Sequence, residues 1–114
     1  MKIWIDGSGW NGKESKYCVA FEDGKVIKEI IKEEKTNNVM EYLALIRALE
    51  VCNEEDEIFT DSKLVVEQVM ERWKIKKEHL FPLVMKARKL LKEKNCSLTW
   101  ISREENFAGH LLEK

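Results

Sequence analysis

The sequence has little of several residue types whose abundance defines a class of protein. It contains one proline in 114 residues and no low-complexity tract, so nothing indicates a linker, and we expect a single domain over residues 1–114. It has only three cysteines, Cys18, Cys52 and Cys96, which are odd in number, widely spaced and set among apolar neighbours. This pattern favours reduced core thiols over a disulfide framework or a zinc site, and indicates a cytoplasmic protein.

Long apolar runs and an excess of one charge are also lacking. No run reaches membrane-spanning length, and Met1 leads directly into a strand-like Ile3-Trp4-Ile5, so we expect neither a membrane partner nor a signal peptide. The formal net charge is −1 although 36% of residues are charged. Binding of a nucleic acid would therefore need a local basic patch or metal ions. Nothing indicates an obligatory protein partner, and we expect a monomer.

The segment Thr36–Val51 carries the clearest periodicity. Only three of residues 39–51 are charged, which predicts a helix that is apolar nearly all round and packs inside the protein on a sheet. Glu41 lies in the first turn of this helix, where burial of a carboxylate is costly unless a cation or a hydrogen-bond donor meets it. An alternative is that Asn38 is the N-cap and Glu41, at N3, completes a capping box.

The other elements follow from short apolar runs and helical spacing. Three strands joined by short turns, one of them containing Asp23-Gly24, predict an antiparallel meander. Helical connections make the later strands parallel, so we expect an α/β fold: a mixed five-stranded sheet of three antiparallel and two further parallel strands, flanked by helices. The predicted strands are 2–6, 16–21, 26–31, 57–60 and 97–101, and helices are predicted at 39–51, 62–73, 80–94 and, with Asn106 as cap, up to Leu112.

Two of these strands end alike, each delivering an aspartate followed shortly by a hydroxyl residue. Asp6 and Asp61 occupy these positions, and parallel neighbours would place both at the carboxyl edge of the sheet, where ligands gather. The start of the central helix would bring Glu41 to the same point. Three oxygen ligands suit Mg²⁺ or Mn²⁺, and two such ions can activate water and stabilise the leaving oxygen in phosphodiester hydrolysis.

Four segments in this order resemble type 1 ribonuclease H: Asp6–Ser8, Thr36–Glu41, Thr60–Ser62 and Trp100–Asn106. The chain is similar to the compact, archaeal-like form that lacks a basic protrusion. The resemblance implies a ribonuclease H-like fold and an endonuclease that cuts the RNA strand of RNA/DNA hybrids, leaving 5′-phosphate and 3′-hydroxyl ends. It also implies that the catalytic metal ligands for Mg²⁺ or Mn²⁺, with two ions when the hybrid is bound, are Asp6, Glu41 and Asp61.

The resemblance further implies residues that contact the hybrid. Asn37 and Asn38 would read the minor groove, where a 2′-hydroxyl distinguishes RNA from DNA. A tryptophan followed by lysines would replace the missing protrusion, with a ring beside amines that neutralise phosphates. The alternative is that the tryptophan ends its helix in the core and the lysines are solvated. The predicted substrate-binding residues are Gly7, Ser8, Asn37, Asn38, Ser62, Trp73, Lys74, Lys76 and Lys77.

The chain departs from the family pattern at its end. The family places a fourth aspartate four residues after Asn106, a position occupied here by His110, and no aspartate follows Asp61. If His110 is a fourth catalytic metal ligand, it would favour Mn²⁺ over Mg²⁺. The alternative is that His110 is an ordinary helix residue that lies on the surface or packs against its neighbours. Because a fold does not fix a substrate, two other functions stay open: an inactive nucleic-acid-binding module, and a nuclease acting on double-stranded RNA or DNA junctions.

Overall fold

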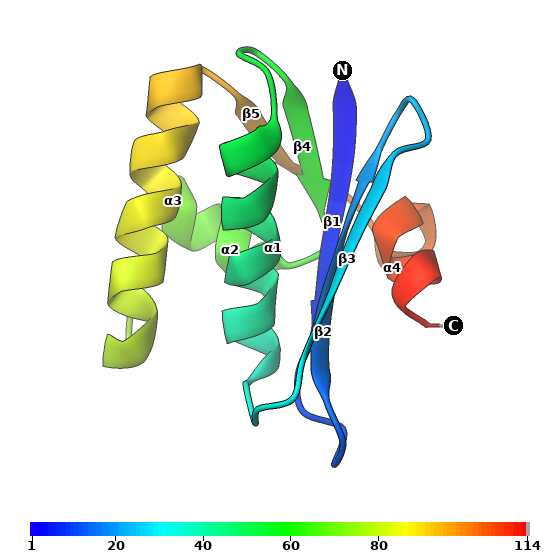
Figure 1. Ribbon diagram of the computed structural model, residues 1–114. Coiled ribbons are helices and arrows are strands. Elements are labelled where there is room, and N and C mark those ends of the chain that lie inside the picture. The colour runs from blue at the N-terminus through cyan, green and yellow to red at the C-terminus, as the bar shows by residue number, and fades with distance from the viewer. Residues whose placement is uncertain (114) are drawn as a thin grey trace.

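The computed structural model describes residues 1–113 and contains a five-stranded sheet in the order β3-β2-β1-β4-β5, with helices on both faces (Figure 1). The strand β1 pairs antiparallel with β2, and β2 with β3, whereas β4 is parallel to β1 and β5 to β4. The predicted fold class is therefore confirmed. The elements are β1 Lys2–Ser8, β2 Ser15–Phe21, β3 Val26–Ile31, α1 Asn37–Val51, β4 Glu57–Thr60, α2 Lys63–Val69, α3 Phe81–Lys94, β5 Ser97–Trp100 and α4 Phe107–Leu112, with short 3-10 turns at Glu78–Leu80 and Arg103–Glu105.

The helix α1 lies between the sheet and α3, while α4 covers the opposite face of the sheet (Figure 1). The apolar residues of α1 are buried almost all round the helix, including Met40, Tyr42, Leu45 and Leu49. Burial of each such side chain stabilises the fold by about 1.5–3 kcal/mol. The position of α1 thus follows from its lack of a polar face.

The start of α1 differs from the prediction. The N-cap is Thr36, whose extended backbone leaves its Oγ1 free to accept the Val39 N–H at 3.1 Å. Asn38 is consequently inside the first turn, and the predicted cap is wrong. Glu41 is the fifth helical residue, so the capping box does not form. Its carboxylate instead accepts a hydrogen bond from the Gly7 N–H, at 3.1 Å.

The strand β1 continues two residues beyond its predicted end because Gly7 and Ser8 pair with Tyr17 and Lys16 of β2. Gly7 lies directly under α1: a Cβ there would collide with the backbone of Met40 and Glu41. The glycine therefore allows the start of α1 to approach β1 closely enough for the hydrogen bond between Gly7 and Glu41.

The helix α2 ends at Val69, although helical spacing predicted that it continues to Trp73. Glu71 adopts a left-handed conformation (φ 65°), and the N–H groups of Arg72 and Trp73 both donate to the Glu67 carbonyl, which stops the helix. Trp73 lies outside the helix with 45% of its surface exposed. The alternative in which this ring ends a helix in the core is therefore wrong.

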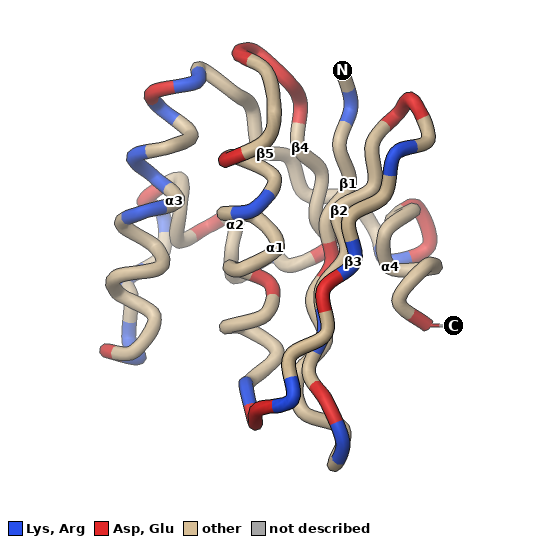
Figure 2. Tube along the Cα trace, in the orientation of Figure 1, with Lys and Arg blue, Asp and Glu red and all other residues tan. Residues whose placement is uncertain are grey.

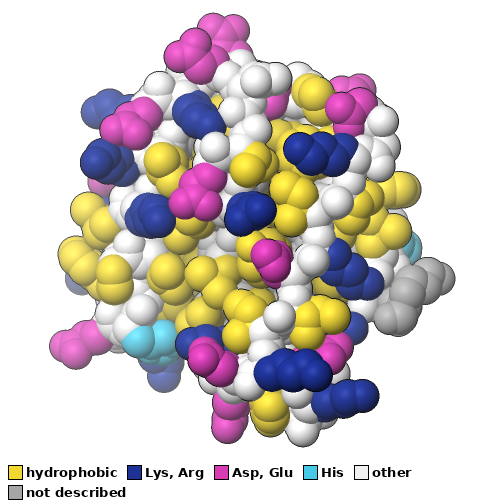
Figure 3. Space-filling model, viewed as in Figure 1, with side chains coloured by type: hydrophobic (Ala, Val, Ile, Leu, Met, Phe, Trp, Pro, Cys, Tyr) yellow, Lys and Arg dark blue, Asp and Glu magenta, His cyan; other side chains and the backbone are white. Residues whose placement is uncertain are grey.

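Charges of both signs are spread over the surface. Lys and Arg are spaced along α3, and acidic residues lie in the neighbouring loops (Figure 2). The face formed by α1, α3 and β3 mixes both charges with apolar side chains (Figure 3). This mixture agrees with the small net charge and gives that face no field of one sign. None of the helices within residues 1–113 has the length and apolar character needed to cross a bilayer.

Candidate metal centre

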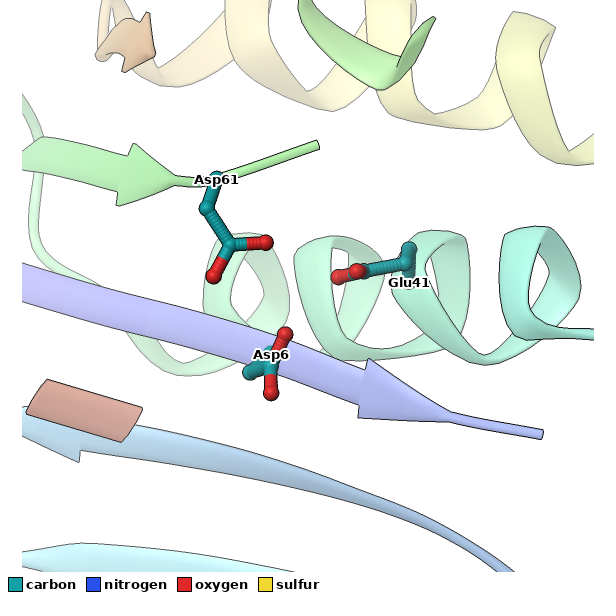
Figure 4. Close-up of side chains that lie close together, drawn as sticks. All are labelled: Asp6, Glu41 and Asp61. Atoms are coloured by element: carbon teal, nitrogen blue, oxygen red, sulfur yellow. The ribbon is translucent and has the colours of Figure 1, made fainter. Parts of the chain in front are cut away.

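Two neighbouring parallel strands deliver the aspartates of the site. The last residue pair between β1 and β4 joins Ile5 to Thr60, and the next residues are Asp6 and Asp61. Glu41 reaches the same point from α1. The three side chains point toward one another (Figure 4), and one carboxylate oxygen from each lies within 4.8 Å of the others. The predicted convergence of the three acids is therefore observed.

Each carboxylate has a different hydrogen-bond environment. Glu41 Oε1 accepts the Gly7 N–H, and Asp61 Oδ2 accepts the side-chain amide of Asn106 at 2.9 Å. Asp6 Oδ1 is buried, and no donor within residues 1–113 reaches it. A buried carboxylate oxygen without a partner is costly, and a cation bound among the three acids would supply the missing interaction.

The electrostatics of the cluster favour the same conclusion. Burial, followed by the charges of Asp6 and Asp61, raises the pKa of Glu41 to about 9. Burial and the charge of Asp61 raise the pKa of Asp6 to about 6, although Arg103 acts in the opposite direction. A divalent cation reverses this effect because it stabilises every carboxylate in its ionised form. The oxygen-only donor set and the orphan oxygen fit Mg²⁺ or Mn²⁺.

Asn106 supports this cluster in a way that the sequence did not reveal. The sequence predicted its role as the cap of α4, and its Oδ1 does accept the Ala108 N–H at 3.1 Å. Its amide nitrogen also donates to Asp61 and to the Ile5 carbonyl, both at 2.9 Å, from a fully buried position. Asn106 thus ties α4 to the ends of β1 and β4. A cap preference alone does not indicate such a second role.

The structure does not bring His110 into the carboxylate group. Its ring is exposed, and Nε2 lies 2.8 Å from the Glu104 carbonyl oxygen. Gly109 is the α4 residue that faces the cluster, since a Cβ there would lie 3.4 Å from Asp6 Oδ2. Adjacent helical residues differ by about 100° in direction, so His110 faces elsewhere when Gly109 faces Asp6. The sequence spacing therefore predicted the correct helix, α4, but His110 does not reach the carboxylate cluster.

All of the predicted substrate-binding residues except Ser62 line two cavities beside the start of α1. A cavity of about 430 Å³ contains the acids of β1 and α1, and a second of about 630 Å³ combines apolar and basic side chains. Ser62 caps α2 beside Asp61, accepting the Val65 N–H at 3.2 Å. The first cavity is lined by Gly7, Ser8 and Asn37 among others, and the second by Asn38, Trp73, Lys74, Lys76 and Lys77.

The sheet order, the helices on both faces and the acids at the ends of β1 and β4 define a ribonuclease H-fold protein with a candidate site for divalent cations. Comparison with known proteins makes this assignment specific. The model of the family described as "Reverse transcriptase-like" matches residues 22–114, and the chain belongs to this family.

One curated relative is the "Bifunctional protein Rv2228c" of Mycobacterium tuberculosis, which is 38% identical over 76 residues. The match covers 62% of this chain and 21% of that protein, so the chain spans about a fifth of the length of the curated relatives that it matches. The relation thus concerns one part of a longer protein.

Solved structures match almost the whole chain. The N-terminal RNase H domain of Rv2228c from M. tuberculosis has a TM-score of 0.80 and 32% identity, covering 96% of this chain and 88% of that one. RNase H1 from Halobacterium salinarum has a TM-score of 0.78 and 28% identity, covering 97% and 92%. LC11-RNase H1, solved with an RNA/DNA hybrid, has a TM-score of 0.76 and 30% identity, covering 97% and 91%. These matches confirm the resemblance to type 1 ribonuclease H.

Proposed function

We propose that this chain is a metal-dependent endoribonuclease that hydrolyses the RNA strand of RNA/DNA hybrids to 5′-phosphate and 3′-hydroxyl ends. The observation that carries the proposal is the meeting of Asp6, Glu41 and Asp61 within 4.8 Å, with a buried oxygen of Asp6 that has no partner in residues 1–113. The RNA/DNA hybrid bound by the similar LC11-RNase H1 supports the choice of substrate.

The three carboxylates would hold Mg²⁺ or Mn²⁺, with two ions when substrate is bound. When bound, such cations supply Lewis-acid chemistry that activates water and stabilises the leaving oxygen of an in-line displacement. Residues of the chain hold these carboxylates in place without a cation. Glu41, whose pKa is raised to about 9 by burial and by the neighbouring acids, would lose its proton on binding a cation. Gly7 and Asn106 hold Glu41 and Asp61 by hydrogen bonds that need no rearrangement.

The two cavities that flank the start of α1 would bind the hybrid. Asn37 lines the carboxylate cavity and Asn38 lines the basic one, so these consecutive residues connect the two cavities. Asn37 Oδ1 accepts the Gly9 N–H at 2.6 Å, which fixes its orientation. In the second cavity, Trp73 offers an exposed ring beside lysines 74, 76 and 77, a combination that suits a sugar-phosphate backbone.

The test uses labelled RNA/DNA hybrid, RNA duplex and DNA duplex, each incubated with the chain in Mg²⁺ or Mn²⁺. We expect cleavage of the RNA strand of the hybrid, loss of cleavage in Asp6→Asn, and normal cleavage in Asp23→Asn, a charge-matched change in the exposed β2–β3 turn. Hybrid binding without cleavage would favour the inactive module. Cleavage of the RNA duplex would favour the related nuclease.

We also propose that the chain acts as a cytoplasmic monomer without an obligatory protein partner. The cytoplasmic location is supported by the three cysteines, which are free thiols rather than disulfides. Light scattering at micromolar concentration should give a mass near 13.5 kDa, and a stable dimer would contradict it.

A further inference from the structure

A pair of thiols lies far from the carboxylate site. Cys52 directly follows α1 and Cys96 directly precedes β5, and their sulfur atoms are 3.5 Å apart although the residues are 44 positions apart in sequence. Cys52 is buried and Cys96 is partly exposed, while Cys18 belongs to a separate apolar cluster on the α4 side of the sheet. The sequence predicted reduced core thiols that are widely spaced along the chain, and the fold makes two of them neighbours.

The backbone around this pair is held in place on both sides. The Glu55 N–H donates to the Lys94 carbonyl at 2.9 Å, and the Ser97 N–H donates to the Asp56 carbonyl at 3.2 Å. The Lys94 ammonium also donates to the Cys52 carbonyl at 2.9 Å. Because these bonds join the two segments, the sulfurs meet in the folded protein at a high effective concentration.

We propose that Cys52 and Cys96 form an intramolecular disulfide when the folded protein meets a low-molecular-weight disulfide, and that the cross-link stabilises the fold. A disulfide bond is about 2.05 Å long, so the sulfurs need to approach by about 1.5 Å, a distance within reach of side-chain rotation. The cross-link would enclose β4, α2 and α3 in one loop.

The reaction balances as two exchange steps. The Cys96 thiolate attacks one sulfur of the small disulfide, which forms a mixed disulfide and releases one small thiolate. Cys52 then loses its proton to solvent and attacks the Cys96 sulfur, forming the protein disulfide and releasing the second thiolate. Cys96 reacts first because it is the more accessible, and because burial and the adjacent Cys96 raise the pKa of Cys52 to about 12. The two cysteines are oxidised and the small disulfide is reduced to two thiols.

The cross-link is detected with the full chain, reduced, freed of reductant and then incubated with oxidised glutathione. Trypsin should yield a linked pair of peptides, residues 48–63 and 95–103, that separates on addition of dithiothreitol. The Cys18→Ala variant should give the same linked pair, whereas Cys96→Ser should give none. Glutathione retained on Cys96 without the linked pair, or a disulfide that involves Cys18, would overturn the proposal.

Stability provides an independent measurement. Closing a loop of this length restricts the unfolded chain, and for a domain of this size we expect the thermal midpoint of oxidised Cys18→Ala to rise by about 10 °C over its reduced form. The partly exposed Cys96→Ser variant should show the same midpoint in both conditions. An unchanged or lower midpoint in the cross-linked protein would refute the stabilising role.

Discussion

Binding of a divalent cation should release about one proton from the protein at pH 7. Burial and the neighbouring acids raise the pKa of Glu41 to about 9 and that of Asp6 to about 6. At pH 7 these values leave the pair of acids holding about one proton between them. Because the cation binds carboxylates, these protons leave on binding, and the affinity should rise about tenfold per pH unit near neutrality.

The assay is calorimetric titration of metal-free protein with Mn²⁺ in buffers of different ionisation enthalpy. The slope of apparent binding enthalpy against buffer enthalpy gives the number of protons released, which should fall from about 1.5 at pH 6 to about 0.5 at pH 9. In Glu41→Gln the release at pH 7 should fall well below one proton, because the group with the more strongly raised pKa is gone. A slope near zero in the unmodified chain at all three pH values would refute the argument that burial keeps Glu41 protonated before metal binds.

Four further outcomes are expected. Without metal, the thermal midpoint should fall as pH rises from 5 to 8, because the raised pKa values of Asp6 and Glu41 make the folded state bind more protons than the unfolded state in that window. Saturating Mn²⁺ should flatten this slope. A midpoint that rises with pH without metal would contradict the raised pKa values. Asn106→Ser keeps a neutral acceptor for the α4 cap but loses the amide donor to Asp61, so Mn²⁺ affinity should fall about tenfold. Ala108→Gly, which loosens α4 without touching the acids, should leave that affinity unchanged. Changing Lys74, Lys76 and Lys77 together to Glu should weaken hybrid binding and reduce the slope of log affinity against log salt concentration by up to about three. The charge-matched triple change of Lys32, Lys89 and Lys92 to Glu should preserve that slope. Equal effects of the two triple changes would indicate that the first three lysines are simply solvated. His110→Ala should leave Mn²⁺ affinity within about twofold in the same calorimeter, since its ring lies at the Glu104 carbonyl; a larger loss would restore it as a ligand.

The fold was predictable because its signals are local and agree with one another. The bounds of β3 and β4 match the predicted strands, since each is a short apolar run delimited by turn residues. The helical connections then required β4 and β5 to be parallel to β1, and this connectivity placed Asp6 beside Asp61. Convergence of the acids was therefore a consequence of topology that the sequence could specify.

The errors arose where two local choices compete and tertiary contacts decide. Thr36 and Asn38 are both good caps, and the contact between α1 and β1 at Gly7 is visible only in three dimensions. The apolar spacing predicted that α2 continues to Trp73, and it did not indicate that Glu71 adopts a left-handed conformation. For His110 the spacing located the helix, but the direction of a side chain changes by about 100° per residue, so an offset of one position decides whether it reaches the cluster.

The buried acids also predict that cation binding and the stability of the fold are coupled. Glu41 lies in a helix whose other buried residues are apolar, and it receives one backbone donor, while Asp6 keeps an oxygen without a partner among the described residues. Such a cluster opposes folding when all its members are ionised, so the fold is more stable when Glu41 keeps its proton or when a cation is bound. Since Gly7 brings α1 close to β1 and Asn106 anchors α4 to Asp61, the contacts that assemble the sheet edge are also those that orient the acids. A cation that binds the folded chain and not the unfolded one therefore stabilises these same contacts, adding about 2.7 kcal/mol when its concentration is a hundred times its dissociation constant.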